Sequence, residues 1–95
     1  MTDFASMTDE QLNRAAAEVM GHSMGVPASS LDDLKRLADT LGIGVEVEIS
    51  NPNRDDMRAM AWPKSDPRDV CAYNDPVPAR AGLIALLMVL EKRKE

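Results

Sequence analysis

The side chains of this chain that are best suited to bind a ligand or a partner are the aromatic and arginine residues in its second half. Trp62 and Tyr73 are two of the three aromatic residues, and both lie beside proline-containing segments. Aromatic and arginine side chains dominate protein interfaces, and they also stack on bases and pair with phosphates. In a purely structural alternative, the aromatics cover a sheet edge and the arginines neutralise nearby aspartates. The candidate residues for binding a ligand or partner are Arg54, Arg58, Trp62, Arg68, Tyr73 and Arg80.

Residues typical of catalysis are sparse. His22 is the only histidine, and a catalytic triad also needs a nucleophile and an orienting partner. Cys71 is the only cysteine and falls in a segment expected to be a buried strand, where cysteine behaves as a small apolar residue. Glu46 and Glu48 share one face of an expected strand, and we expect them to keep that face hydrated. The sequence therefore predicts a protein that is not an enzyme, with no catalytic residue, metal site or cofactor.

The composition predicts one folded domain spanning residues 1–95. The 11 basic and 16 acidic residues give a net charge of −5, which repels phosphate and argues against direct nucleic-acid binding. The first half is the acidic one, since residues 1–50 hold three basic and nine acidic side chains. A single cysteine and the lack of an export signal favour the cytoplasm. The longest apolar run, residues 81–90, is about half of what a membrane span needs, so no membrane association is expected.

Two helices are expected in the first half. Thr8 and Gln11 have the spacing of a capping box, and apolar residues then follow a 3.6-residue period, which predicts a helix over residues 9–20. Ser29 or Ser30 is expected to cap a second helix, whose leucines form one stripe before Gly42 ends it. Residues 1–7 precede these elements and are expected to be flexible.

Three strands are expected next. Residues 45–50 alternate apolar and polar side chains, which is typical of a strand with one buried face. Residues 51–56 are rich in turn formers, so residues 57–62 are expected to return antiparallel, with Arg58 facing Glu46 or Glu48. Residues 69–73 are expected to form a short third strand. Together these elements predict an α+β fold, a small α-α-β-β-β-α domain with a three-stranded, mainly antiparallel sheet packed with helices.

The last helix is expected to start after Asn74 or Asp75 as cap, with prolines in its first turn, and to reach about Lys92. It is apolar around its whole circumference, so one face of a small sheet cannot bury it. Either another helix packs on its far side, or residues 79–92 form an interface with a second subunit. Both alternatives stay open from the sequence, as does the question whether helices cover one face of the sheet or both.

This order of elements resembles the phage α/β/α-sandwich domain, a family of small bacteriophage proteins. The resemblance lies in the first helix and the Met-Gly pair that ends it, in the capped second helix that leads into a strand, and in the last strand that leads through a proline turn into a helix. The corresponding segments are residues 10–22, 30–49 and 70–90. The resemblance implies a phage-encoded protein that works in the cytoplasm of an infected bacterium, and it supplies no catalytic residues.

The function expected from these observations is binding without catalysis. The first hypothesis is a phage accessory protein that inhibits a host protein, for example a component of antiviral defence, because an acidic domain can occupy a basic surface by charge complementarity. The alternative is a homo-oligomer that sequesters a small cyclic nucleotide. In that alternative the arginines bind phosphates, and Trp62 or Tyr73 stacks on the base.

Overall fold

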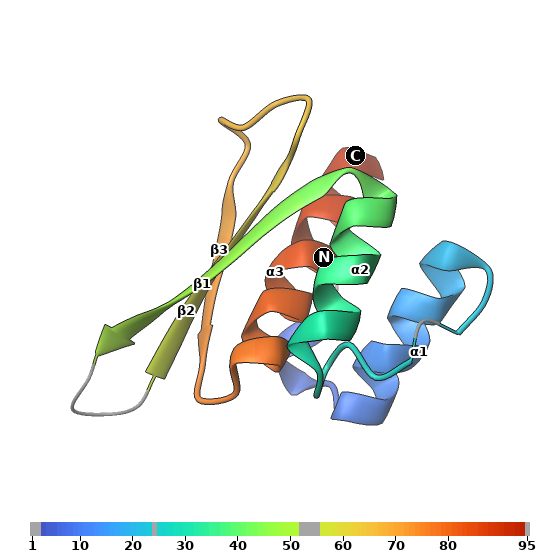
Figure 1. Ribbon diagram of the computed structural model, residues 1–95, viewed down its shortest axis with the longest axis horizontal. Coiled ribbons are helices and arrows are strands. Elements are labelled where there is room, and N and C mark those ends of the chain that lie inside the picture. Colours follow the sequence, from blue (N-terminus) through green and yellow to red (C-terminus); the bar gives the residue numbers. More distant parts are fainter. Residues whose placement is uncertain (1–2, 24, 52–55, 95) are drawn as a thin grey trace.

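The computed structural model describes residues 3–23, 25–51 and 56–94 of the chain. Within them the element order is α-α-β-β-β-α, preceded by one 3-10 turn (Figure 1), so the expected α+β fold is confirmed. The elements are the turn η1 (Phe4–Ser6), helices α1 (Asp9–Met20), α2 (Leu31–Leu41) and α3 (Pro78–Lys94), and strands β1 (Ile43–Asn51), β2 (Asp56–Pro63) and β3 (Cys71–Asp75).

The first two helices begin and end where the sequence predicts. The Thr8 hydroxyl accepts a hydrogen bond from the Gln11 backbone N–H at 3.2 Å, and the Gln11 side chain accepts one from the Thr8 N–H at 2.9 Å. The Ser30 hydroxyl caps α2 by accepting a hydrogen bond from the Asp33 backbone N–H at 3.3 Å. Both helices end at a glycine in the left-handed region, Gly21 with φ +79° and Gly42 with φ +70°, where a residue with a Cβ would be strained.

The sheet is an antiparallel meander in the order β1-β2-β3. Glu48 lies opposite Arg58 in the register, one of the two pairings that the sequence allowed. The third strand begins at Cys71, two residues later than predicted, because the Asp69 N–H donates to the Asp66 carbonyl at 3.1 Å and keeps residues 66–69 in a turn. Residues 52–55 of the predicted turn lie outside the described residues.

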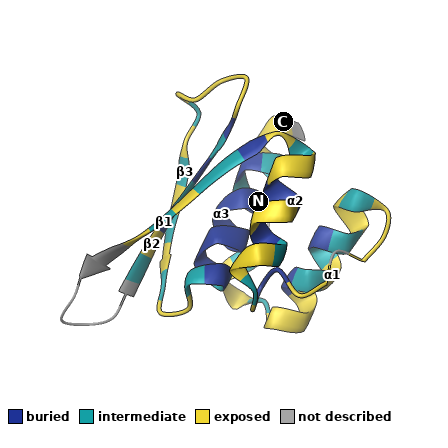
Figure 2. Cartoon of the chain, in the orientation of Figure 1, coloured by how far each residue is buried: buried dark blue, intermediate teal, exposed yellow. Residues whose placement is uncertain are grey.

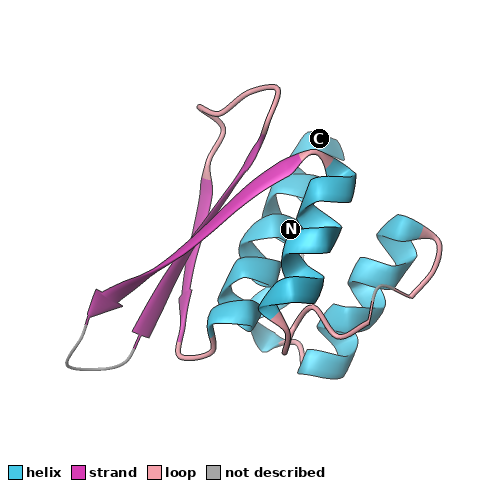
Figure 3. Ribbon diagram, viewed as in Figure 1, coloured by secondary structure: helices cyan, strands magenta, loops and turns pink. Residues whose placement is uncertain are grey.

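All three helices lie on one face of the sheet (Figures 1 and 3). The strands alternate accordingly, with Ala59 and Ala61 of β2 buried against the helices and Arg58 exposed on the outer face. Among the described residues, nothing covers that outer face. The open question of one covered face or two is thus decided, and the arrangement differs from the sandwich in the name of the family that the sequence resembles.

Helix α3 is buried on almost its whole circumference (Figure 2). The sheet covers one side, α2 lies beside α3 and also contacts β1, and α1 contacts α3 on the side away from the sheet. Leu83, Leu86 and Val89 are all fully buried within the single chain. The first of the two sequence alternatives therefore accounts for this helix, and its burial requires no second subunit.

The start of α3 differs from the prediction. The Ala81 N–H donates to the Val77 carbonyl at 2.9 Å, so Val77, and neither Asn74 nor Asp75, immediately precedes the helix. Asp75 ends β3 and accepts a hydrogen bond from the Val77 N–H at 3.0 Å. Pro78 takes the first helical position, where its missing N–H costs little. In the described part of the chain, no helix has the length and apolar character needed to cross a bilayer.

Candidate functional site

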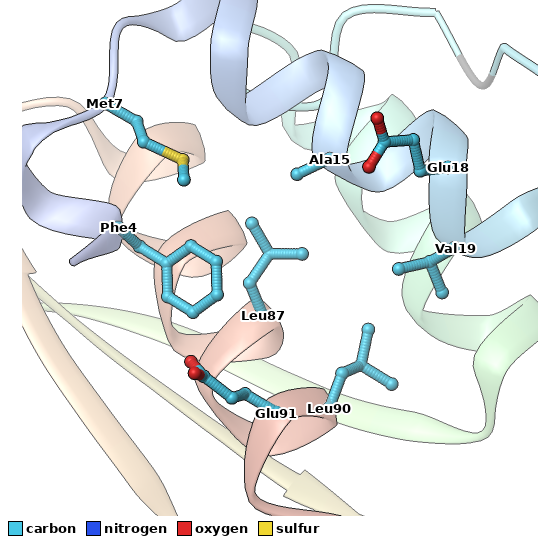
Figure 4. Close-up of a pocket in the computed structure, with 8 residues that line it drawn as sticks. All are labelled: Phe4, Met7, Ala15, Glu18, Val19, Leu87, Leu90 and Glu91. Carbon is cyan, nitrogen blue, oxygen red and sulfur yellow. The ribbon is translucent and has the colours of Figure 1, made fainter. Parts of the chain in front are cut away.

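A groove lined mainly by apolar side chains lies between the start of the chain, α1 and α3 (Figure 4). Its volume is about 440 Å³, within the range of about 300–1,000 Å³ of many ligand sites. Phe4, Leu87, Leu90 and Val19 point into it, with Met7 above them in the view. The complete lining is Phe4, Met7, Ala15, Glu18, Val19, Leu87, Leu90 and Glu91, and we call this set the α1–α3 groove.

Two helical stripes build the groove. Each helix contributes residues spaced i, i+3 and i+4, which lie on one helical face, and these are Ala15, Glu18 and Val19 from α1 and Leu87, Leu90 and Glu91 from α3. Leu87 is buried and forms the floor, whereas Val19 is 39% exposed at the mouth. A branched apolar side chain at the mouth of an apolar groove is available for contact with another molecule.

The charged groups of the groove are both carboxylates. Glu18 projects from α1 and Glu91 from α3, and Figure 4 shows them on opposite sides of the apolar centre. Both lie in a chain of net charge −5. The exposed carboxylate of Glu18 therefore places a negative charge at one border of the groove, which disfavours a phosphate ligand there.

Besides α1 and α3, the η1 segment forms a third wall of the groove, and Arg80 holds this wall in place. Its guanidinium donates to the backbone carbonyls of Ala5 and Met7 at 3.2 and 2.7 Å, which ties the η1 segment to α3. It also forms ion pairs with Asp9 at 2.8 Å and with Asp75 at 3.3 Å. One side chain thus connects the start of the chain, α1, the end of β3 and the first turn of α3. This is possible because the planar guanidinium offers five N–H donors.

Arg80 is consequently a structural residue in this chain. Its side chain is only 16% exposed, and its donors are directed at internal partners. From the sequence, Arg80 is a candidate ligand-binding residue, because arginines and aromatics in the same half of a chain can pair with phosphates and stack on bases. Long-range pairing with Asp9 could not be read from the sequence, since the two residues are 71 positions apart.

Arg58 and Trp62 lie on the exposed outer face of the sheet. Arg58 is opposite Glu48 and Trp62 is opposite Gly44 in the register. The Trp62 indole lies directly over Gly44, because a Cβ built on that glycine would come within 2.5 Å of the ring. Tyr73 has the opposite orientation and packs against the hydrophobic core on the helix side. The sheet therefore separates the two aromatics.

The two remaining candidate residues are Arg68 and Arg54. Arg68 lies in the loop between β2 and β3, with a side chain that is 97% exposed and 3.8 Å from Asp66. Arg54 lies outside the described residues. Within one chain, the candidates that the structure describes thus occupy the outer sheet face, the core side of the sheet, a loop and an internal ion-pair cluster, and they do not converge on one ligand.

Cys71 and Lys92 are the described groups with shifted pKa values. Burial raises the pKa of the Cys71 thiol above its ordinary value, and the nearby charge of Lys92 opposes that shift. A hydrogen bond to Asp69 raises the pKa of Lys92. This contact also ties the loop before β3 to the end of α3. The thiol is thus held protonated at neutral pH, which disfavours a role as a nucleophile.

No metal site is found in residues 3–23, 25–51 and 56–94, where no three histidine, cysteine, aspartate or glutamate residues gather closely enough to hold an ion. His22 is exposed, with its Nδ1 atom 3.1 Å from the carbonyl of the adjacent Ser23.

No protein-family model, curated protein or solved structure matches this chain. The resemblance to a phage family stays a prediction. The groove was not predicted from the sequence, although the i, i+3, i+4 spacings of its lining residues are visible there. Spacing shows which residues share a helical face, but it does not show which faces meet.

Proposed function

We propose that this chain is a phage accessory protein that acts without catalysis, by binding a protein of the infected bacterium and blocking it. The observation that supports this proposal is the α1–α3 groove, an apolar concavity with an exposed valine at its mouth. Protein interfaces draw most of their binding energy from a few apolar or aromatic anchors that fill such pockets. Phe4 and Met7 add an aromatic and an adaptable side chain of the kinds that are enriched at interfaces.

The acidic charge supports blocking as the mode of action. Residues 1–50 carry nine acidic and three basic side chains, and they include α1 with its groove residues. An acidic surface is steered toward a basic one, which is the kind of surface that proteins use to bind nucleic acid. We therefore expect the partner to be a component of antiviral defence that uses a basic surface to bind nucleic acid.

The nucleotide alternative has less support. It requires arginines and an aromatic side chain at one place, whereas Arg80 is paired internally and Trp62 and Tyr73 lie on opposite faces of the sheet. The exposed carboxylate of Glu18 at the groove also repels phosphate. We therefore favour a protein ligand.

The test compares two matched valine variants in a pull-down from bacterial lysate. Val19→Glu places a charge at the mouth of the groove, and Val70→Glu places the same charge at a similarly exposed position before β3. The wild type and Val70→Glu should retain the same host protein, and Val19→Glu should lose it. That host protein, identified by mass spectrometry, should lose activity when a stoichiometric amount of the chain is added.

Circular dichroism must show that both variants are folded, as their exposure of 39% and 44% leads us to expect. If the wild type retains no host protein, or if Val19→Glu retains it equally well, the proposal is refuted.

A further inference from the structure

We propose that the free edge of β1 binds an extended segment of another protein, which adds to the sheet as an antiparallel strand and carries lysine or arginine at alternate positions. This edge lies on the sheet, whereas the α1–α3 groove lies on the side of α3 away from the sheet, so the two surfaces are separate. Three features carry the inference, namely the direction of the backbone groups of β1, the partial burial of two valines and the charge of two glutamates.

The backbone groups of β1 point alternately toward β2 and away from it. Gly42 and Lys64 lie opposite each other in the register, and the Lys64 N–H donates to the Gly42 carbonyl at 3.0 Å. Hydrogen-bonded and non-hydrogen-bonded pairs alternate along an antiparallel ladder, so the even-numbered residues of β1 bond to β2. The N–H and C=O groups of Val45 and Val47 therefore point to the free edge. Within residues 3–23, 25–51 and 56–94, no hydrogen bond from another segment reaches them.

The side chains of these two valines also report an open edge. Val45 and Val47 face the helices and lie 3.4 and 3.5 Å from a Cβ built on Gly82 of α3. They are nevertheless only half-buried, whereas Ala61 and Ala59, their partners in β2, are fully buried. The reason is that β2 has a strand on each side and β1 has a strand on one side only. Apolar side chains of an added strand would cover the exposed part of both valines.

Of the two edges of the sheet, β1 is the one suited to strand addition. The other edge strand, β3, has five residues and is followed by Pro76, whereas β1 has nine residues. Edge strands are commonly protected by short length, proline, bulges or inward-pointing charges. In β1 the bulge lies at the far end, between Ile49 and Asn51, and the inward-facing residues before it are apolar. The helices all lie on one face of the sheet, so none of them continues the sheet beyond β1 (Figure 3).

Charge selects the strand that this edge accepts. Glu46 and Glu48 are exposed on the outer face, opposite Met60 and Arg58, so β2 sets one cation against two carboxylates. Side chains of an added strand on this face would lie about 4.5–5.5 Å from the glutamates between Cβ atoms, where lysine or arginine is favoured. A second copy of β1 would bring its own glutamates to this edge, and like charges on neighbouring strands are destabilising. The edge therefore repels its own copy and attracts a basic strand.

The test uses labelled nine-residue peptides, which match β1 in length, in fluorescence anisotropy titrations with the full chain. The first peptide alternates valine and lysine, and the second alternates valine and glutamate. The valine–lysine peptide should bind at least about tenfold more tightly than the valine–glutamate peptide, because only its charges complement Glu46 and Glu48.

Methylation of backbone nitrogens tests the pairing itself. Two versions of the valine–lysine peptide carry N-methyl groups, one on its valines and the other on its lysines. In the antiparallel pairing the peptide valines lie opposite Val45 and Val47 and direct their N–H groups at β1, whereas the N–H groups of the lysines point away. Methylated valines should therefore weaken binding by at least about tenfold, and methylated lysines should leave the affinity within about threefold.

Charge reversal in the protein provides a second matched pair. Glu46→Lys should weaken binding of the valine–lysine peptide by about tenfold and improve binding of the valine–glutamate peptide. Glu10→Lys makes the same change on α1, where the side chain is 85% exposed, and should leave both affinities within about twofold. Equal changes in the two variants would indicate a general charge effect and overturn the inference.

The remaining outcomes also decide the inference. Binding of the valine–lysine peptide weaker than about 1 mM, or an equal effect of the two methylation patterns, overturns strand addition. Loss of binding with methylated lysines alone would indicate a parallel strand and overturn the antiparallel pairing. A dimer in light scattering that the valine–lysine peptide dissociates would place a second copy on the edge and overturn the inference. The proposed function is tested separately by the Val19 and Val70 variants, so either proposal can fail without the other.

Discussion

Replacing Arg80 with methionine should destabilise the fold and loosen the wall of the groove that η1 forms. Arg80 and Asp75 are only 16% and 15% exposed, so losing this charged contact should cost about 1.5–3 kcal/mol. The pair with the half-exposed Asp9 adds about 0.5 kcal/mol. The carbonyls of Ala5 and Met7 lie near the surface, and water can replace part of what they lose. The expected loss is therefore about 2–4 kcal/mol.

The measurement is urea unfolding followed by circular dichroism, with a thermal scan beside it. A loss of about 2–4 kcal/mol corresponds to a fall in Tm of about 10–30 °C in a domain of this size. Arg68→Met is the matched control, because the Arg68 side chain is 97% exposed and its free energy of unfolding should change by less than about 0.5 kcal/mol. Arg80→Lys should recover part of the loss, since lysine keeps the charge but cannot reach four acceptors at once.

Hydrogen exchange supplies a local readout. The N–H groups of Ser6 and Met7 donate within the η1 turn, and they should exchange faster in Arg80→Met even where the rest of the chain is folded. If Arg80→Met is within about 0.5 kcal/mol of the wild type, or if these two amides exchange at the wild-type rate, then Arg80 does not hold the wall.

Three further predictions concern local features. Thr8→Ala removes one half of the capping box and should cost about 1 kcal/mol in urea unfolding; an unchanged midpoint would contradict the cap. Gly44→Val should displace the indole of Trp62, the only tryptophan, and shift its fluorescence emission to longer wavelength, whereas unchanged emission would show that the ring does not lie on the glycine. Because burial disfavours the thiolate and raises the pKa of Cys71, the folded chain keeps this proton at a pH where the unfolded chain loses it. The free energy of unfolding should therefore be unaffected by this group below about pH 9 and fall as the pH rises further, and Cys71→Ala should reduce that fall. Alkylation of Cys71 at pH 7.5 should be several-fold slower in the folded chain than in urea, and equal rates would refute the burial argument.

Local signals predicted most of the fold correctly. The capping box at Thr8 and the left-handed glycines at residues 21 and 42 act over one helical turn, so the sequence reports them directly. The alternation of apolar and polar residues along β1 predicts which of its side chains face the core. The errors fell at element boundaries, where a turn or a side-chain contact competes with the strand or the helix cap for the same residues. A turn at residues 66–69 delays β3 to Cys71, and Asp75 pairs with Arg80 where a helix cap was expected.

The candidate site was less predictable. Residue type alone made the arginine and aromatic residues candidates, but Arg80 forms internal pairs and Tyr73 packs against the core. The groove instead draws Phe4 from the start of the chain, Val19 from α1 and Leu90 from α3. Residues so far apart in the sequence become neighbours only when helices pack, and side-chain type does not encode that packing.

By itself, the sequence determined the periods, caps and turns of the elements, because these depend on contacts within a few residues. It also determined that α3 needs cover on every side, since its apolar residues surround the helix. Only the tertiary structure decided that α1, α2 and one face of the sheet supply that cover, which leaves the outer sheet face exposed. The same packing brought residues from the start of the chain, α1 and α3 together around the groove. The physical reason is that long-range packing optimises the burial of all apolar stripes together, so no single stripe specifies its partner.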